Sequence, residues 1–212
     1  MKPLLGCIAD DITGATDLAL MLGRHGMPVV QYIGLPHEEE DDPDAAAVVI
    51  ALKSRTIQAS EAVEASVTAA RWLQRRNVRQ MYFKYCSTFD STDDGNIGPV
   101  MNALLTETEG QLAPVCPAFP ANLRTVYQGH LFVGSQLLSD SSMRQHPLTP
   151  MTDANLVRVL GRQLDHPDEV GLLSIEIVEK GPIAVRRKIK DMIDNGLRFA
   201  VTDALTNDHL NT

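Results

Sequence analysis

Two adjacent carboxylates follow the first apolar run of the chain, where a strand should end. The run from Leu4 to Ala9 has strand length, and Asp10 and Asp11 come directly after it, before Thr13 and Gly14. In open α/β sheets, ligands bind just beyond the carboxyl ends of the strands. A helix that begins there offers free backbone N–H groups to an anion. The pattern indicates a site for a polar, hydroxylated anion, with a metal nearby or a proton to remove. The alternative is that one aspartate only caps the helix.

Further polar side chains follow two other predicted strands, at residues 45–52 and 79–85. Because the carboxyl ends of parallel strands share one edge of a sheet, we expect these side chains to converge in a cleft. There, Arg55 could hold a substrate carboxylate through two parallel hydrogen bonds, while Lys84 supplies a compact positive charge. Taken singly, an arginine or serine after a strand is usually only a turn residue. The candidate ligand-binding residues are Ser54, Arg55, Lys84, Ser87, Asp90, Ser91 and Thr92.

The elements that must position these residues alternate between strand-like and helix-like segments along the whole chain. This alternation predicts an α/β fold with a mostly parallel, doubly wound sheet and helices on both faces. After the first strand, the predicted strands are 28–34, 45–52, 79–85, 113–116, 170–177 and 198–203. The predicted helices are 17–24, 60–76, 97–107, 153–163 and 182–194, and residues 206–209 resemble a helix start that no helix follows.

A long segment, residues 117–150, interrupts the alternation and is rich in Pro, Gly, Ser and aromatic residues. Within it, residues 127–134 predict a β-hairpin that could serve as an arm or a lid, since loops of this length in compact domains are usually functional. His130 and His146 are acid–base candidates there. A lone histidine is more often a hydrogen-bonded structural residue, which we take as the main interpretation.

The composition limits the classes of function. The 212 residues suffice for one large domain or two small ones. A net charge of −8 argues against nucleic acid as a partner, and no apolar run is long enough to span a membrane. The three cysteines have neither disulfide nor metal spacing, which favours buried free thiols and a cytoplasmic location. The acidic run 38–42 is expected to be a solvated loop.

Several catalytic signatures are absent from the sequence. There is no G-x-x-x-x-G-K-[ST] loop, no G-x-G-x-x-G after the first strand, no G-x-S-x-G elbow and no H-E-x-x-H. The Asp10–Thr13 stretch has a superficial similarity to haloacid-dehalogenase phosphatases, but that pattern requires Asp-x-Asp and Ile12 stands at its third position. A hydrolase with Asp10 as nucleophile is therefore a weak alternative.

Taken together, the motifs resemble those of the four-carbon acid sugar kinase family, over nearly the whole chain. The first matching stretches are Ile8–Ala15, Lys53–Arg55, Phe83–Thr92 and Gly95–Val100. They continue through Cys116–Ala121, Arg124–Val133 and His146–Leu156. The forms Tyr-Cys-Ser-Thr-Phe-Asp-Ser-Thr, His-Leu-Phe-Val and Pro-Leu-Thr-Pro-Met are most similar to the branch that phosphorylates 3-oxo-tetronate. One departure is Leu123, where the family usually has glycine before the arginine, and a bulky leucine is not expected to take a left-handed turn readily.

The resemblance implies that residues 1–212 are the N-terminal, substrate-binding domain of a two-domain kinase. Its C-terminal domain, which would mainly bind ATP and Mg²⁺, is expected to lie outside this sequence. The N-terminal domain alone should therefore bind an acid sugar without phosphorylating it. The implied reaction transfers the ATP γ-phosphoryl group to the 4-hydroxyl of 3-oxo-tetronate. Arg55 and Lys84 would hold the substrate carboxylate, and Arg124 belongs to the implied binding set. Asp10 or Asp11 would orient or deprotonate the attacking hydroxyl.

The sequence leaves a second reading open, in which the chain is a truncated, non-catalytic module that binds acid sugars. No residue is predicted to hold a metal within the chain itself. The expected partners are a small acid sugar and ATP, with neither nucleic acid nor membrane. The oligomeric state is open, and a homodimer is compatible with the sequence.

Overall fold

The computed structural model describes residues 3–38 and 44–212, so most of the acidic run 38–42 lies outside the described residues. The chain forms two compact units. The first unit comprises residues 1–85 and 99–109, and the second comprises residues 86–98 and 110–212. The candidate site residues are divided between the two units, and each unit is considered by itself below.

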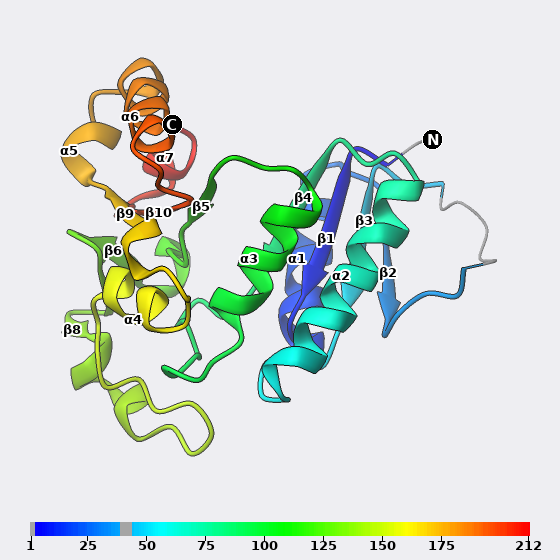
Figure 1. Ribbon diagram of the computed structural model, residues 1–212, viewed down its shortest axis with the longest axis horizontal. Coiled ribbons are helices and arrows are strands. Elements are labelled where there is room, and N and C mark those ends of the chain that lie inside the picture. Colours follow the sequence, from blue (N-terminus) through cyan, green and yellow to red (C-terminus); the bar gives the residue numbers. More distant parts are fainter. Residues whose placement is uncertain (1–2, 39–43) are drawn as a thin grey trace. The chain divides into compact units, whose positions relative to one another are not determined.

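The first unit is built on a parallel sheet of four strands, β1 (Leu5–Ala9), β2 (Val29–Ile33), β3 (Ala47–Ala51) and β4 (Gln80–Lys84) (Figure 1). Their order is β2-β3-β1-β4. The register aligns Ala9 with Ala51 on one side and with Lys84 on the other, so the carboxyl ends of β1, β3 and β4 lie level. All five residues of β3 are buried, as expected of an apolar strand inside a parallel sheet. This arrangement places the residues that follow these three strands at one edge.

Helices cover both faces of this sheet: α1 (Ile12–Arg24), α2 (Ala59–Arg75) and α3 (Ile97–Glu107). Side chains of β1 and β3 alternate between the faces, because successive residues of a strand point to opposite sides. On one face, Cys7, Ala9, Val49 and Ala51 pack with α1 residues that include Ala15 and Leu18. On the other face, Ile8, Val48 and Ile50 pack with Trp72 and Leu73 of α2 and Leu104 of α3. The predicted doubly wound arrangement is therefore confirmed in this unit.

The second unit contains a three-stranded parallel sheet and a three-stranded antiparallel sheet (Figure 1). The parallel sheet has the order β5-β10-β9, from β5 (Ala113–Val115), β9 (Val170–Leu173) and β10 (Phe199–Thr202). The antiparallel sheet is formed by β6 (Arg124–Tyr127), β7 (His130–Val133) and β8 (Gln136–Leu137). The α-helices are α4 (Leu156–Arg162), α5 (Ile175–Val178), α6 (Pro182–Asp194) and α7 (Asn207–Leu210). The 3₁₀ helices are η1 (Pro120–Asn122), η2 (Leu138–Asp140), η3 (Ser142–Gln145) and η4 (Pro167–Glu169).

The α/β class, the mostly parallel strands and the hairpin are confirmed, with differences in detail. The parallel strands form two sheets rather than one. The strand predicted over 170–177 ends at Leu173, because Ser174 precedes the short helix α5. The helix predicted over 17–24 begins earlier, at Ile12, and the residues predicted as a helix start near Thr206 form the single turn α7. The hairpin is longer than predicted and begins at Arg124.

A fully buried aspartate, Asp203, ties the hairpin turn to the parallel sheet of the second unit. Its carboxylate accepts backbone N–H hydrogen bonds from Gln128 and Gly129 in the turn, both at 2.8 Å, and from Ile175 at 3.0 Å. Burial raises the pKa of Asp203, while the three N–H donors act in the opposite direction. The side chain that ends β10 thus satisfies three backbone donors that lie far away in the sequence.

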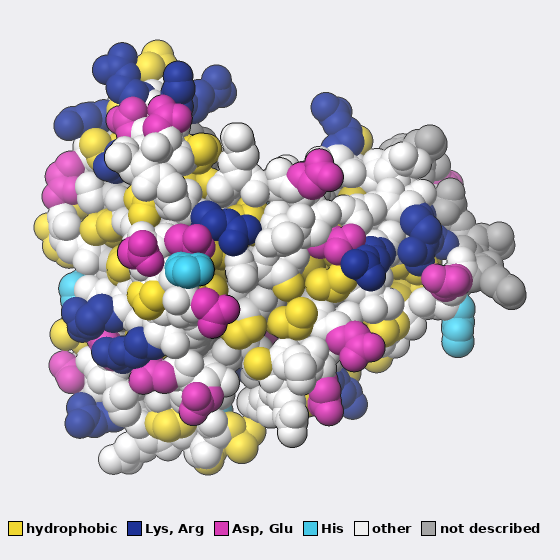
Figure 2. Space-filling model, viewed as in Figure 1, with side chains coloured by type: hydrophobic (Ala, Val, Ile, Leu, Met, Phe, Trp, Pro, Cys, Tyr) yellow, Lys and Arg dark blue, Asp and Glu magenta, His cyan; other side chains and the backbone are white. Residues whose placement is uncertain are grey.

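The surface shows no continuous basic region on the face in view in Figure 2, where acidic and basic side chains are interspersed and Lys and Arg gather over α6. Arg186, Arg187 and Lys190 of this helix are exposed, which is typical of a solvated helix face. No described helix is both long and apolar enough to cross a membrane.

Candidate functional site

At the carboxyl edge of the first sheet, Arg55 holds both predicted aspartates. Its Nε and Nη2 donate to the two carboxylate oxygens of Asp10, at 2.9 and 2.8 Å, in a two-bond fork. Nη2 also lies 2.9 Å from Oδ1 of Asp11. Asp10 is 5% exposed and Asp11 is partly exposed. The prediction that these loops meet is confirmed for these residues, but the fork that we assigned to a substrate carboxylate is engaged by Asp10 in this structure.

Asp11 is the N-cap of α1, since its Oδ1 accepts the N–H of Gly14 at 3.0 Å. The capping alternative is therefore correct for Asp11 and incorrect for Asp10, whose carboxylate binds Arg55. Oδ2 of Asp11 has no partner among the described residues, and neither have the first two N–H groups of α1, on Ile12 and Thr13. A helix N-terminus with unused N–H groups attracts an anion.

Lys84 ends β4 beside this helix N-terminus. Its Nζ donates to the carbonyl of Tyr85 at 2.7 Å and pairs with no carboxylate in the described part of the chain. A Cβ added to Gly14 would lie 3.3 Å from this Nζ and 2.6 Å from Oδ1 of Asp11. Glycine at this position lets both charged groups approach the first turn of α1.

These four residues, Asp10, Asp11, Arg55 and Lys84, form what we term the charged cluster. Two carboxylates balance two cations, so the cluster can accept an added anion at less electrostatic cost than an acidic site could. Burial raises the pKa of Asp10, and the hydrogen bonds from Arg55 oppose that effect. Because both Asp10 oxygens are bonded and the residue is buried, the geometry does not favour the alternative of Asp10 as a hydrolase nucleophile.

The second unit contains a small pocket of about 240 Å³, where Ser91 and Thr92 lie among its lining residues. We call it the Ser91 pocket. Its polar lining also includes Asp93, Asp94, Thr152, Asp153 and Arg162. The apolar lining comes from Pro150, Met151 and Val159. A volume below the range of about 300–1,000 Å³ that is usual for drug-sized ligands indicates a ligand of a few carbon atoms.

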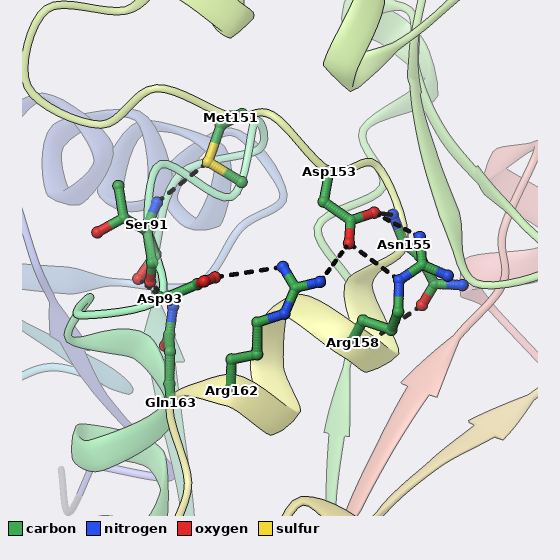
Figure 3. Close-up of polar contacts among 9 residues, drawn as sticks. Ser91, Asp93, Met151, Asp153, Asn155, Arg158, Arg162 and Gln163 are labelled. Carbon is green, nitrogen blue, oxygen red and sulfur yellow. Dashed lines mark hydrogen bonds and ion pairs between the residues drawn. The ribbon is translucent and has the colours of Figure 1, made fainter.

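Arg162 crosses the rim of the pocket between two carboxylates. Figure 3 shows it extending from α4 toward Asp93 and Asp153, with N–O distances of 3.3 and 3.2 Å. Asp153 also accepts two hydrogen bonds from Arg158, at 2.7 and 2.9 Å. Desolvation acts to raise the pKa of Asp153, but the hydrogen bonds from Arg158 and from the Asn155 N–H outweigh it and lower that pKa. The pocket lining thus carries three carboxylates and one arginine, and that arginine is already paired with two of them.

Gln163, the C-cap residue of α4, holds the loop that contributes Ser91 and Thr92 to the pocket lining. Its Oε1 accepts the N–H of Gly98 at 2.7 Å, while its Nε2 donates to Ser91 Oγ at 2.8 Å and to the Thr92 carbonyl at 2.6 Å. A Cβ on Gly95 would lie 2.0 Å from Ser91 Oγ, and one on Gly98 would lie 2.6 Å from Gln163 Cβ. The loop from Ser91 to Gly98 therefore wraps closely around one amide side chain.

The other predicted residues of the second unit lie outside the pocket lining. Asp90 is buried and accepts a short hydrogen bond from Thr88 Oγ1, while Ser87 is partly exposed. Arg124 donates to the Asn122 carbonyl within its own loop. Leu123 has φ +57°, so the prediction that leucine would avoid the left-handed turn is wrong. The side chain is 66% exposed, so packing adds nothing to the local steric cost of this left-handed backbone.

The two candidate histidines bond to backbone groups near them in the sequence, and the three cysteines are free thiols. His130 Nδ1 donates to the Gln128 carbonyl at 2.8 Å, and His146 Nδ1 accepts the Thr149 N–H at 3.0 Å. The three cysteines are unpaired, as predicted. Burial raises the pKa of Cys7 to about 12, which leaves this thiol protonated and unreactive at neutral pH.

Two observations on the described residues concern metal and phosphate binding. No group of three His, Cys, Asp or Glu side chains in this part of the chain is arranged to hold a metal ion. At the N-terminus of α3, the N–H of Ile97 lies 3.4 Å from Ser91 Oγ, the N–H of Gly98 binds Gln163, and Pro99 has no N–H to offer. This helix end is closed to a phosphate.

Gln163 and Arg162 are the functional candidates that sequence reasoning missed. Both lie at the end of a predicted helix, about 70 residues from the loop that they contact, and no local motif marks them. Only the packing of α4 against residues 91–98 reveals their role.

Comparisons with known proteins identify the family of the chain. A family model described as a sugar-binding N-terminal domain matches residues 5–212. A Burkholderia multivorans protein described as 3-oxo-tetronate kinase is 56% identical over 209 residues, 99% of this chain and 48% of that protein. Several other curated relatives, down to 47% identity, carry the same description. The chain spans about half the length of the curated relatives it matches.

Two solved structures share the fold. A Haemophilus influenzae protein of family DUF1537 has a TM-score of 0.92 and 45% identity, covering 97% of this chain and 49% of that one. A Bordetella bronchiseptica protein of the same family, a domain-swapped dimer with bound citrate, has a TM-score of 0.78 and 25% identity. It covers 98% of this chain and 49% of its own. By the match of the family model over residues 5–212, the chain belongs to the family of sugar-binding N-terminal domains.

Proposed function

We propose that this chain is the acid-sugar-binding part of an ATP-dependent kinase that converts 3-oxo-tetronate to 3-oxo-tetronate 4-phosphate. The observation that carries the proposal is the charged cluster at the N-terminus of α1, where unused N–H groups lie beside Lys84. Support comes from the relatives described as 3-oxo-tetronate kinases and from the related Bordetella protein, which binds the carboxylic acid citrate.

The substrate carboxylate binds at the first turn of α1. The N–H groups of Ile12 and Thr13 donate to it, and Lys84 contributes the one cation of the cluster that has no carboxylate partner. Arg55 holds Asp10 and Asp11 in place and keeps the local charge balanced. Charge-assisted hydrogen bonds of this kind are among the stronger polar contacts in proteins.

Of the two aspartates, Asp11 is the better candidate to orient or deprotonate the attacking hydroxyl. Its Oδ2 is unpartnered in the described structure, whereas both oxygens of Asp10 accept from Arg55. A base must lie within hydrogen-bond reach of the proton that it removes, and Asp11 is the one of the two with an unpartnered and partly exposed carboxylate oxygen in the described structure. Asp10 acts as a positioning residue for Arg55.

The γ-phosphoryl group comes from ATP with Mg²⁺, which neutralises its charge during transfer. Among the described residues no group of three side chains is arranged to hold the metal, and the N-terminus of α3 is closed to a phosphate. The nucleotide is therefore assigned to the part of the longer relatives that this chain does not cover. Such a kinase would work in the cytoplasm, where ATP is supplied, and the domain-swapped dimer of the Bordetella relative supports a homodimer.

A fusion experiment tests the proposal against the alternative of a non-catalytic acid-sugar-binding module. The chain is joined to the uncovered part of the Burkholderia relative, and ATP consumption is measured with 3-oxo-tetronate and Mg²⁺. Turnover by the fusion, none by the chain alone, and a large loss in Asp11→Asn would support the kinase assignment. A fusion that folds and binds ATP but shows no turnover would favour the module, and full activity of Asp11→Asn would remove the base from that residue.

A further inference from the structure

We infer that the Ser91 pocket recognises the hydroxyl groups of a small neutral polyol segment, and that Gln163 is the positioning residue that makes Ser91 a hydrogen-bond donor toward it. The inference deepens the proposed function and rests on it for the class of ligand, a short hydroxylated chain. It assigns a chemistry to the second unit that differs from the anion chemistry of the charged cluster.

The first step concerns the orientation of the Gln163 amide. Its Oε1 faces a backbone N–H, that of Gly98, and its Nε2 faces a backbone carbonyl, that of Thr92. A backbone N–H can only donate and a carbonyl can only accept, so the two contacts fix the amide in one orientation. Nε2 must therefore donate to the third neighbour, Ser91 Oγ, at 2.8 Å.

The second step concerns the proton of the Ser91 hydroxyl. The other neighbour of Oγ is the N–H of Ile97, at 3.4 Å, which is also a donor. Both contacts use lone pairs of Oγ, and no described residue accepts its proton. Ser91 is 2% exposed and lies in the pocket lining, so a buried donor is left without an acceptor there. A ligand oxygen would satisfy it.

The third step concerns charge. The pocket wall carries Asp93, Asp94 and Asp153 but only one cation, Arg162, which is paired with two of those carboxylates. Carboxylates accept hydrogen bonds from hydroxyl groups and repel anions. The adjacent N-terminus of α3 is closed by Ser91 and Gln163, so it offers an anion nothing. The lining thus combines the Ser91 hydroxyl and the hydroxyls of Thr92 and Thr152 with several carboxylate acceptors, an arrangement that a sugar hydroxyl, both donor and acceptor, can satisfy.

The test is an amide NMR titration of the whole chain with erythritol, a neutral four-carbon polyol, and with succinate, a four-carbon dianion. We expect erythritol to shift the amide resonances of residues 91–94 and 152–153, and succinate to leave them in place. Ser91→Ala should weaken erythritol binding by about 3- to 10-fold, the value of one hydrogen bond. Ser66→Ala is the matched control, because Ser66 is equally buried but lies in α2 of the first unit.

A second variant separates positioning from simple packing. In Gln163→Glu the carboxylate still accepts from Gly98 but also accepts the Ser91 proton, so the donor turns away from the pocket. We expect a loss similar to that of Ser91→Ala, and little further loss when the two substitutions are combined. Additive losses, an unchanged affinity in Ser91→Ala, or succinate shifting the pocket amides in wild type would overturn the inference. The comparison of erythritol with succinate uses the wild-type chain alone, so it does not depend on whether a variant folds.

The two proposals can fail separately. If erythritol binds in the pocket but the fusion enzyme has no kinase activity, the pocket inference stands and the proposed function fails. If the fusion phosphorylates 3-oxo-tetronate with equal efficiency in wild type and Ser91→Ala, and erythritol causes no shifts, the kinase assignment stands and the pocket inference fails.

Discussion

The two units hold their polar side chains in opposite ways. In the charged cluster, ionised side chains hold one another: Arg55 spans Asp10 and Asp11, and the helix N-terminus supplies the remaining donors. In the Ser91 pocket, a neutral amide holds a hydroxyl, and glycines let the backbone close around it. The difference teaches that charge placement at a sheet edge depends on pairing, whereas hydroxyl placement in a loop depends on steric fit. Substitutions should therefore affect the two regions differently.

The largest expected effect is that of Arg55→Met, which removes the partner of a buried carboxylate. Breaking such a pair costs about 3–5 kcal/mol, and we expect the lower end because Arg55 is partly exposed. Trp72, the one tryptophan, is buried in the first unit, so its fluorescence during urea unfolding reports on that unit. Burial already raises the pKa of Asp10, and loss of Arg55 should raise it further. The loss of unfolding free energy relative to wild type should therefore grow as pH rises and shrink toward pH 4.

The control for this prediction is Asp10→Asn combined with Arg55→Met, which removes the charge that was left unpaired. The double variant should recover part of the lost stability and should lose the pH dependence of the deficit. If Arg55→Met alone unfolds at the wild-type urea concentration, the ion pair has no role in holding the charged cluster together.

Two glycine substitutions compare the regions directly. In Gly95→Ala, the new Cβ meets the Ser91 hydroxyl and the Thr92 carbonyl, and we expect a loss of about 2 kcal/mol from overpacking. In Gly14→Ala, the new Cβ must displace the end of the Asp11 side chain, which weakens its cap on α1, but alanine favours a helix by about 0.5–1 kcal/mol, so the net loss should be smaller than in Gly95→Ala. Amide exchange in β9 and β10 measures the stability of Gly95→Ala, and Trp72 fluorescence during urea unfolding measures that of Gly14→Ala. Equal losses would contradict the distinction between steric and charged placement.

Asp153→Asn tests the ion pairs at the rim of the Ser91 pocket, and we expect it to cost less stability than Arg55→Met or Gly95→Ala. Losing exposed ion pairs to Arg158 and Arg162 and weakening the bond to Asn155 should cost about 1 kcal/mol at pH 7. The pKa of Asp153 is lowered, so its stabilisation is present above its ordinary pKa and is lost as pH falls. Amide exchange at pH 7, with circular dichroism melts at pH 7 and pH 3, should show the deficit vanishing in acid. A deficit that persists at pH 3 would point to packing instead.

The last predicted effect is a small gain in stability. Leu123→Gly relieves a left-handed backbone at an exposed position, and relief of about 1–2 kcal/mol exceeds the entropic cost of glycine, about 0.5–1 kcal/mol. We expect a net stabilisation below 1 kcal/mol, visible as a small rise in melting temperature. Gly129→Ala is the opposite control, because it places a Cβ at φ +71° and should lower that temperature.

The sequence predicted the elements well because their signals are local. Asp10, Asp11, Arg55 and Lys84 could be placed at one edge, since parallel strands of strong apolar pattern align their carboxyl ends. The division of strands between two sheets could not be predicted, because pairing of β5, β10 and β9 depends on contacts far apart in the sequence. Gln163 could not be predicted as a site residue for the same reason, because its partners lie in a loop that is close to it only in the folded chain.

The most direct test of the account is a calorimetric titration of the chain with 3-oxo-tetronate, comparing wild type with Lys84→Met. If the charged cluster holds the substrate carboxylate, wild type should bind and Lys84→Met should bind at least about tenfold more weakly, a difference of 1.4 kcal/mol. Trp72 fluorescence should show that the variant remains folded. Equal affinity in the two proteins, or no binding by the folded wild-type chain, would contradict the central claim that the cluster at the start of α1 recognises the acid group.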